Sequence, residues 1–309
     1  MKSYQRVLIF LLVALAVTSL LSPWVALLWD SIVHFRPEWG LNSHSFFYIF
    51  RRLLIATGVV LLLCCRFRLG IQSPRQVGLG PVRPGFRQFC LGFLVAVASV
   101  AGLAFFMFQA EIFTPDFDFS LRALGRSGRT LLAALMIGVF EEIFFRGMIF
   151  KGLIKDARPT TAFAVANLFY AGTHFVKPDK KFALDDLDPL GGVRYLIQAF
   201  EPLLDWGILP GLCGLFLIGL ALSYAFLRTE SLYLSIGLHA GWVFGIKSTH
   251  HYGNFSLVEP GWLFGSSEPK FISGVVTWLA IAVVGIVIHL MTRPHPNPLP
   301  RREREGRGS

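Results

Sequence analysis

Long apolar stretches alternate with short polar ones along the whole chain. Eight apolar stretches are long enough to form helices in a membrane. They lie at roughly 7–29, 45–65, 89–109, 130–154, 160–176, 207–228, 231–248 and 271–291. This pattern predicts an all-α, polytopic membrane helix bundle with about eight transmembrane helices. Residues 1–292 would form one integral membrane domain. The stretch 293–309 is rich in proline and arginine, and we expect it to be a disordered basic tail.

The composition and the distribution of charge agree with a membrane protein. The 309 residues are 54% hydrophobic and only 16% charged, whereas soluble domains carry about 25% charged residues. The net charge is +10, but 16 of the 29 basic residues fall on one side if the spans alternate from a cytoplasmic N-terminus. This bias follows the positive-inside rule. It predicts cytoplasmic termini and no nucleic-acid partner, and the compact inner loops are typical of a prokaryotic inner-membrane protein.

Three ionisable residues interrupt the fourth apolar span. Glu141, Glu142 and Arg146 lie between flanks that are nearly all apolar, and a charge at bilayer depth costs about 3 kcal/mol on insertion scales. In a helix, Glu142 and Arg146 are an i,i+4 pair and can form a salt bridge. Glu141 is rotated away from that pair, so we expect it to meet other helices.

The fifth span contains a second set of polar residues. Asn167, Tyr170 and His174 are spaced i, i+3 and i+7, so in one helix they form a polar stripe on a single face. A lone histidine on an apolar helix is usually a packing residue. The stripe and the acids of the preceding span favour an aqueous cavity instead.

The seventh span contains Ser235 and His239 at i,i+4, together with Gly237 and Gly241. The two glycines permit close packing against another helix, whereas packing alone does not explain His239. We therefore expect the acids and the two histidines to meet in the folded protein.

Three chemistries fit such a cluster of acids and histidines. In the first, Glu141 is a general base that activates a water, and histidines orient this water and stabilise an oxyanion. In the second, Glu141, His174 and His239 bind a zinc ion that activates the water, although the sequence contains no His-Glu-x-x-His motif. In the third, the residues form a proton relay of a proton-coupled transporter.

The order of these residues resembles the CAAX protease and bacteriocin-processing enzyme family (CPBP, also called Abi). Its motifs are Glu-Glu-x-x-x-Arg, Phe-x-x-x-His and His-x-x-x-Asn on successive membrane helices. The sequence matches the first in full, the second with tyrosine for phenylalanine, and the third at its histidine only. The matching residues are Glu141, Glu142 and Arg146, then Tyr170 and His174, then His239. The resemblance covers about residues 130–248, the motif-bearing core.

The resemblance implies an intramembrane endopeptidase that cleaves membrane-associated or lipidated protein substrates in a chamber open to the bilayer. It assigns water activation to Glu141 and His174, and oxyanion stabilisation to His239. Glu142 and Arg146 would hold the architecture, with Tyr170 and Asn167 as supporting residues. We favour a mechanism without metal or other cofactor, with zinc as the alternative.

One position departs from the family pattern. Val243 stands where the third motif has asparagine, and valine cannot donate a hydrogen bond. Losing one oxyanion donor typically costs about 10²–10³ in rate. Either Trp242 or Asn167 substitutes as donor, or the chain is a catalytically weak or inactive scaffold or immunity-type member of the fold.

Overall fold

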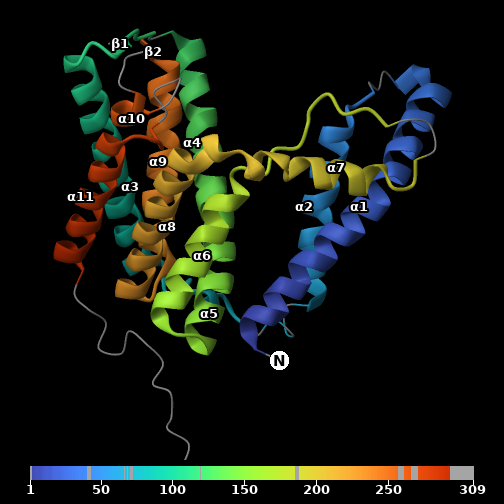
Figure 1. Ribbon diagram of the computed structural model, residues 1–309, viewed down its shortest axis with the longest axis horizontal. Coiled ribbons are helices and arrows are strands. Elements are labelled where there is room, and N and C mark those ends of the chain that lie inside the picture. Colours follow the sequence, from blue (N-terminus) through green and yellow to red (C-terminus); the bar gives the residue numbers. More distant parts are fainter. Residues whose placement is uncertain are drawn as a thin grey trace, which may run out of the picture. The chain divides into compact units, whose positions relative to one another are not determined.

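The computed structural model describes residues 2–292, except for 40–42, 66, 68, 70–71, 119, 185–187, 257–260 and 266–270. The tail 293–309, predicted to be disordered, lies outside the described residues. The described chain is helical apart from one two-stranded sheet (Figure 1). It divides into two compact units, residues 1–72 with 172–208 and residues 73–171 with 209–309.

The first unit is built from α1 (Ser3–Phe35), α2 (Phe46–Cys65) and α7 (Gly191–Ala199). Both α2 and α7 pack against α1 (Figure 1). Phe46 and Phe50 of α2 contact the buried ring of Tyr195 on α7. Two short 3₁₀ turns, Glu201–Leu204 and Trp206–Ile208, follow α7. The segment from residue 191 to residue 208 is thus one short α-helix followed by 3₁₀ turns.

The second unit is a helix bundle that contains all of the family motifs except His174. Its helices are α3 (Val82–Gln109), α4 (Leu121–Glu142), α5 (Lys151–Asp156), α6 (Pro159–Thr173, whose last two residues count with the first unit), α8 (Leu209–Thr229), α9 (Leu232–His251), α10 (Gly261–Phe264) and α11 (Val275–Met291). A 3₁₀ turn at Pro74–Val77 precedes α3. Helix α9 packs against α3, α4 and α8 (Figure 1). Its residues are buried almost without interruption from Leu232 to Trp242, as expected of a helix that is covered on all sides.

Glycines bring α3 and α9 into backbone contact. A Cβ on Gly237 would overlap the carbonyl of Phe89, and a Cβ on Gly241 would lie 2.6 Å from the carbonyl oxygen of Phe93. From the other side, a Cβ on Gly92 of α3 would overlap the carbonyl of Leu234. The close packing predicted from Gly237 and Gly241 is thus confirmed.

A small antiparallel sheet joins the ends of these two helices. Strand β1 (Phe113–Pro115) follows α3, and β2 (Gly253–Phe255) follows α9, with Phe113 opposite Phe255. Because both strands come directly after the C-terminal ends of their helices, α3 and α9 run in the same direction. The sheet and the glycine contacts fix the position of α9 along α3.

Each of the eight apolar spans falls on a helix. Among the described residues, four helical segments are long and apolar enough to cross a membrane by themselves, namely Tyr4–Phe35, Phe46–Cys65, Pro74–Gln109 and Trp206–Thr229, and Val275–Met291 is a shorter apolar helix. Helix α6 has only 15 residues, and the acidic pair interrupts the apolar run of α4. The count of eight transmembrane helices and the cytoplasmic termini therefore stay predictions.

Candidate active site

The acidic pair lies at the end of α4, where the helix changes its winding. The helix begins at a cap, because Ser120 Oγ accepts from the backbone N–H of Ala123 at 3.2 Å. The backbone N–H of Ser120 in turn donates to Asp118 at 2.8 Å, and this bond lowers the pKa of the Asp118 carboxyl below its usual value. After Glu142 the chain continues as a π-helical stretch, Ile143–Phe150. Such stretches occur frequently at functional sites.

Arg146 and Glu142 form the predicted salt bridge inside this helix. Arg146 NH1 donates to Glu142 Oε1 at 2.7 Å, and the two side chains are 1% and 0% exposed. Arg146 NH2 also donates to the backbone oxygen of Gly219 on α8 at 3.2 Å. The guanidinium lies 4.4 Å from the ring centre of Tyr170. The buried charge thus has a counter-ion, a carbonyl and an aromatic face as partners.

His239 of α9 connects the two glutamates. Its Nδ1 lies 2.8 Å from Glu142 Oε1, and its Nε2 lies 3.8 Å from Glu141 Oε2. An ionised carboxylate can only accept, so Nδ1 carries the proton and Nε2 is directed at Glu141. The His239 side chain is 5% exposed, whereas Glu141 is 32% exposed. Glu141 is therefore the more accessible acid, and Glu142 fixes the tautomer of the imidazole.

The bond between Glu142 and His239 could not be read from the sequence. Helical phase pairs Glu142 with Arg146 and predicts that Glu141, which is rotated away, meets the histidines, whereas the shorter contact of His239 is with Glu142. In the structure Glu142 Oε1 accepts from the side chains of both Arg146 and His239. Glu142 therefore orients His239 as well as holding Arg146.

Tyr170 and Asn167 of α6 contribute packing and a link between helices. The Tyr170 ring is buried and stands nearly perpendicular to the His239 ring, with the centres 6.2 Å apart. Asn167 Nδ2 donates to the backbone oxygen of Phe163 at 2.8 Å, and its Oδ1 accepts from Ser223 Oγ of α8 at 2.9 Å. These bonds give Asn167 a supporting role in joining α6 to α8. No spacing in the sequence indicates that Ser223, 56 residues after Asn167, belongs to this link.

His174 does not lie on the helix that carries Asn167 and Tyr170, so the prediction of one helical stripe is wrong at its last member. Helix α6 ends at Thr173. The N–H of Phe175 donates to the carbonyl of Gly172 at 3.0 Å, which closes a tight turn instead of continuing the α-helix. The exposed His174 side chain lies in this turn, on the part of the chain that belongs to the first unit. Its meeting with Glu141 stays a prediction.

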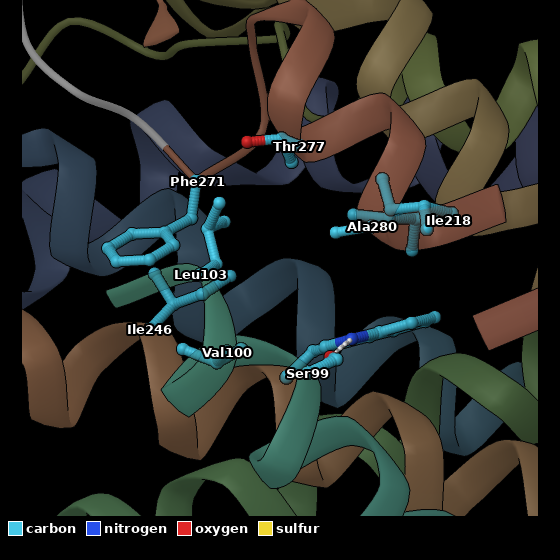
Figure 2. Close-up of a pocket in the computed structure, with 10 residues that line it drawn as sticks. Ser99, Val100, Leu103, Ile218, Ile246, Phe271, Thr277 and Ala280 are labelled. Carbon is cyan, nitrogen blue, oxygen red and sulfur yellow. Dashed lines mark hydrogen bonds between the residues drawn. The ribbon is translucent and has the colours of Figure 1, made fainter. Parts of the chain in front are cut away.

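Both donors expected to replace the missing asparagine are engaged elsewhere. Trp242 Nε1 donates to Ser99 Oγ of α3 at 3.0 Å, beside a cavity of about 20 Å³ (Figure 2). Such a volume holds about one water molecule, so it is too small for a substrate group. The amide of Asn167 donates within α6. Neither residue replaces the asparagine in this structure, and Val243 supplies no side-chain donor.

The zinc alternative can be tested against the donor set. Within the described ranges, no group of three or more His, Cys, Asp or Glu side chains is arranged to hold a metal ion. His239 Nε2 and Glu141 Oε2 are 3.8 Å apart. Zinc bonds to nitrogen and oxygen are about 2.0–2.2 Å long. His239 Nε2 and Glu141 Oε2 could therefore bind the same ion, with a wide nitrogen–zinc–oxygen angle. A third ligand would have to be His174, and zinc binding stays a prediction.

A helical membrane protein with a buried glutamate–histidine cluster is the class that this fold and this geometry define. Residues 126–245 match the family model described as Type II CAAX prenyl endopeptidase Rce1-like. They form a domain of this CPBP (Abi) family, which confirms the resemblance stated for residues 130–248. No curated protein and no solved structure matches the chain. Together with the long apolar helices, this domain indicates an integral, multi-pass membrane protein.

Proposed function

We propose that the protein is an intramembrane endopeptidase of the glutamic, CAAX-protease-like type that hydrolyses peptide bonds of membrane-associated or lipidated substrates. The observation that carries the proposal is the position of His239 between two carboxylates, with Nδ1 on buried Glu142 and Nε2 facing the more exposed Glu141. A histidine held by one acid and directed at a second suits acid–base chemistry. The prokaryotic inner membrane is the proposed location.

Glu141 acts as the general base in this scheme. A water within hydrogen-bond distance of both Glu141 Oε2 and His239 Nε2 can lose a proton to Glu141 as its oxygen attacks the scissile carbonyl carbon. Glu141 then returns that proton to the amine as the carbon–nitrogen bond breaks. The products are a carboxylic acid and an amine, and Glu141 is regenerated. His174 is proposed to orient the water from the turn that follows α6.

His239 is proposed to stabilise the oxyanion. For Nε2 to donate a hydrogen bond to the oxyanion, the ring must carry both protons, because the Nδ1 proton is already donated to Glu142. The formal charges of Glu141, Glu142, Arg146 and a protonated His239 then sum to zero. This balance favours the cluster in surroundings of low dielectric constant.

The proposal is tested with purified protein in liposomes and a library of lipidated and unmodified membrane-anchored peptides. We expect cleavage to be lost in Glu141→Ala and in His174→Ala, while the quantity of folded protein stays the same. Cleavage that survives both substitutions would refute the mechanism. Metal analysis of active protein separates the two schemes, since one bound zinc ion per chain would replace the glutamate-only mechanism.

A specific observation also favours a second function, a catalytically weak or inactive scaffold of the same fold. Val243 donates nothing, and Trp242 and Asn167 are hydrogen-bonded elsewhere. In this case Glu141→Ala retains the full cellular function, while Arg146→Ala abolishes it through loss of the folded protein. Peptides that co-purify with Glu141→Ala from membranes and that the wild type cleaves would identify a substrate and exclude this alternative.

A further inference from the structure

An open apolar groove with a volume of about 450 Å³ runs between α6, α8 and α11 of the second unit. Its α8 wall contains Leu217, Leu220 and Tyr224, and its α11 wall contains Gly285 and His289. The volume falls in the range of about 300–1,000 Å³ that is usual for ligand sites. A groove of this kind on a membrane helix bundle is open to lipid.

The groove lies on a different side of α8 from the candidate active site. Gly219 and Ser223 are the α8 residues that contact the site, through Arg146 and Asn167. With 3.6 residues per turn, Leu217 and Tyr224 project from roughly the opposite face of the helix. A substrate bound at the glutamates therefore leaves the groove available to another molecule.

One end of the groove is polar and cationic. Tyr224 Oη and His289 Nδ1 are hydrogen-bonded at 2.7 Å. One turn further along α8, Arg228 donates through Nε to Thr292 Oγ1 at 3.0 Å and through NH2 to the backbone oxygen of His289 at 3.1 Å. In the part of the chain that the structure describes, Arg228 NH1 makes no hydrogen bond. Its two N–H groups can bind an anion at the end of the groove.

We propose that this groove binds an anionic glycerophospholipid, with one acyl chain along α8 and α11 and the phosphate on Arg228 NH1. The apolar walls suit the chain, and the guanidinium suits the phosphate through charge-assisted hydrogen bonds. Arg228 is on the predicted cytoplasmic side, where anionic lipids give the membrane surface its negative potential. A phospholipid supplies both an acyl chain for the apolar walls and a phosphate for Arg228.

The test uses the full-length protein in mild detergent, with dioleoylphosphatidylglycerol added in steps and dioleoylphosphatidylcholine as the uncharged comparison. A lipid that binds only the folded state raises the melting temperature. Arg228→Gln is expected to weaken the phosphatidylglycerol response roughly tenfold in lipid concentration, the ratio for one lost charge-assisted hydrogen bond. The test variant is Gly285→Leu, whose side chain fills the groove, and its control is Gly102→Leu on α3. The two are comparable because a Cβ at either glycine has no atom within 4 Å.

We expect Gly285→Leu to abolish the phosphatidylglycerol response and Gly102→Leu to retain it. A response that persists in Gly285→Leu would overturn the site, even if Arg228→Gln fails to fold. An equal response to phosphatidylcholine would overturn the recognition of charge. Stabilisation by glycerol phosphate alone would overturn the acyl-chain part. A prenylated peptide that displaces phosphatidylglycerol from the wild type would show that the groove belongs to the substrate instead.

Discussion

Replacing Glu142 by glutamine would remove one charge from the interior of the second unit and keep the shape of the side chain. Glu142 Oε1 accepts from both Arg146 and His239, so the carbonyl oxygen of a glutamine can retain both hydrogen bonds. What is lost is the negative charge beside a guanidinium that is 1% exposed. Breaking a buried ion pair by removing one partner costs about 3–5 kcal/mol. This is a large part of the roughly 5–15 kcal/mol that stabilises a typical domain.

The measurement is a double-mutant cycle by thermal unfolding in detergent. Glu142→Gln is expected to unfold on the order of 10 °C below the wild type, at about 2–4 °C per kcal/mol. Arg146→Met should lose a similar amount, because it leaves the carboxylate of Glu142 buried without its counter-ion. The double variant removes both charges, and we expect it to recover most of the loss. Losses that simply add, or a shift below about 2 °C in either single variant, would refute this account of the pair.

The same positions also separate stability from the orientation of His239. Glu142→Gln/Arg146→Met keeps an oxygen for the Nδ1 proton of His239, whereas Glu142→Leu/Arg146→Met does not. At equal quantities of folded protein, we expect the leucine variant to cleave peptide roughly 10²-fold more slowly than the glutamine variant. This factor is the lower end of the rate contribution usual for a positioned acid–base group. Equal rates would show that Glu142 does not act through His239.

Three further substitutions and one control substitution test other parts of the structure. Val243→Asn should raise the cleavage rate at least tenfold if the site lacks one oxyanion donor, for which the usual factor is about 10²–10³; an unchanged single-turnover rate would show that another group donates. Trp242→Phe should change that rate less than about threefold, because the indole N–H is hydrogen-bonded to Ser99 of α3. A larger loss would indicate that Trp242 donates to the oxyanion. Gly237→Ala should lower the melting temperature strongly, because the added Cβ would overlap the Phe89 carbonyl. The control Gly102→Ala should be neutral or stabilising, because its Cβ has no atom within 4 Å. Equal melting temperatures for the two variants would contradict the close contact of α3 and α9.

The parts of the fold that depend on local spacing were predictable from the sequence. Apolar length placed all eight helical spans, and i,i+4 spacing gave the bond between Glu142 and Arg146 because both residues are on one helix. The small residues Gly237 and Gly241 indicated close packing for the same reason. Each of these predictions needs information only from neighbouring positions in the chain.

The parts that depend on distances between helices were not predictable. Sequence spacing could not show that His239 contacts Glu142 as well as Glu141, or that Trp242 donates to Ser99. It also extended the polar stripe of the fifth span to His174, although the turn bond at Gly172 ends the helix first. The contribution of His174 to the site is the part of the family pattern that now depends most on experiment.

The arrangement of the buried charges also bears on how the protein is made. Arg146 follows Glu142 by four residues, so both belong to one helical segment that is predicted to span the bilayer, whereas 231 residues precede α9, which carries His239. If this segment spans the bilayer as predicted, the nascent chain carries a neutral ion pair into it long before His239 is synthesised. We expect Arg146→Ala to reduce the membrane insertion of a reporter that carries only residues 121–156, and His239→Ala to leave the insertion of α4 unchanged in the full chain. Arg146 would then first neutralise Glu142 during membrane insertion, and the active site would be completed only after α9 has been synthesised and has packed against α4.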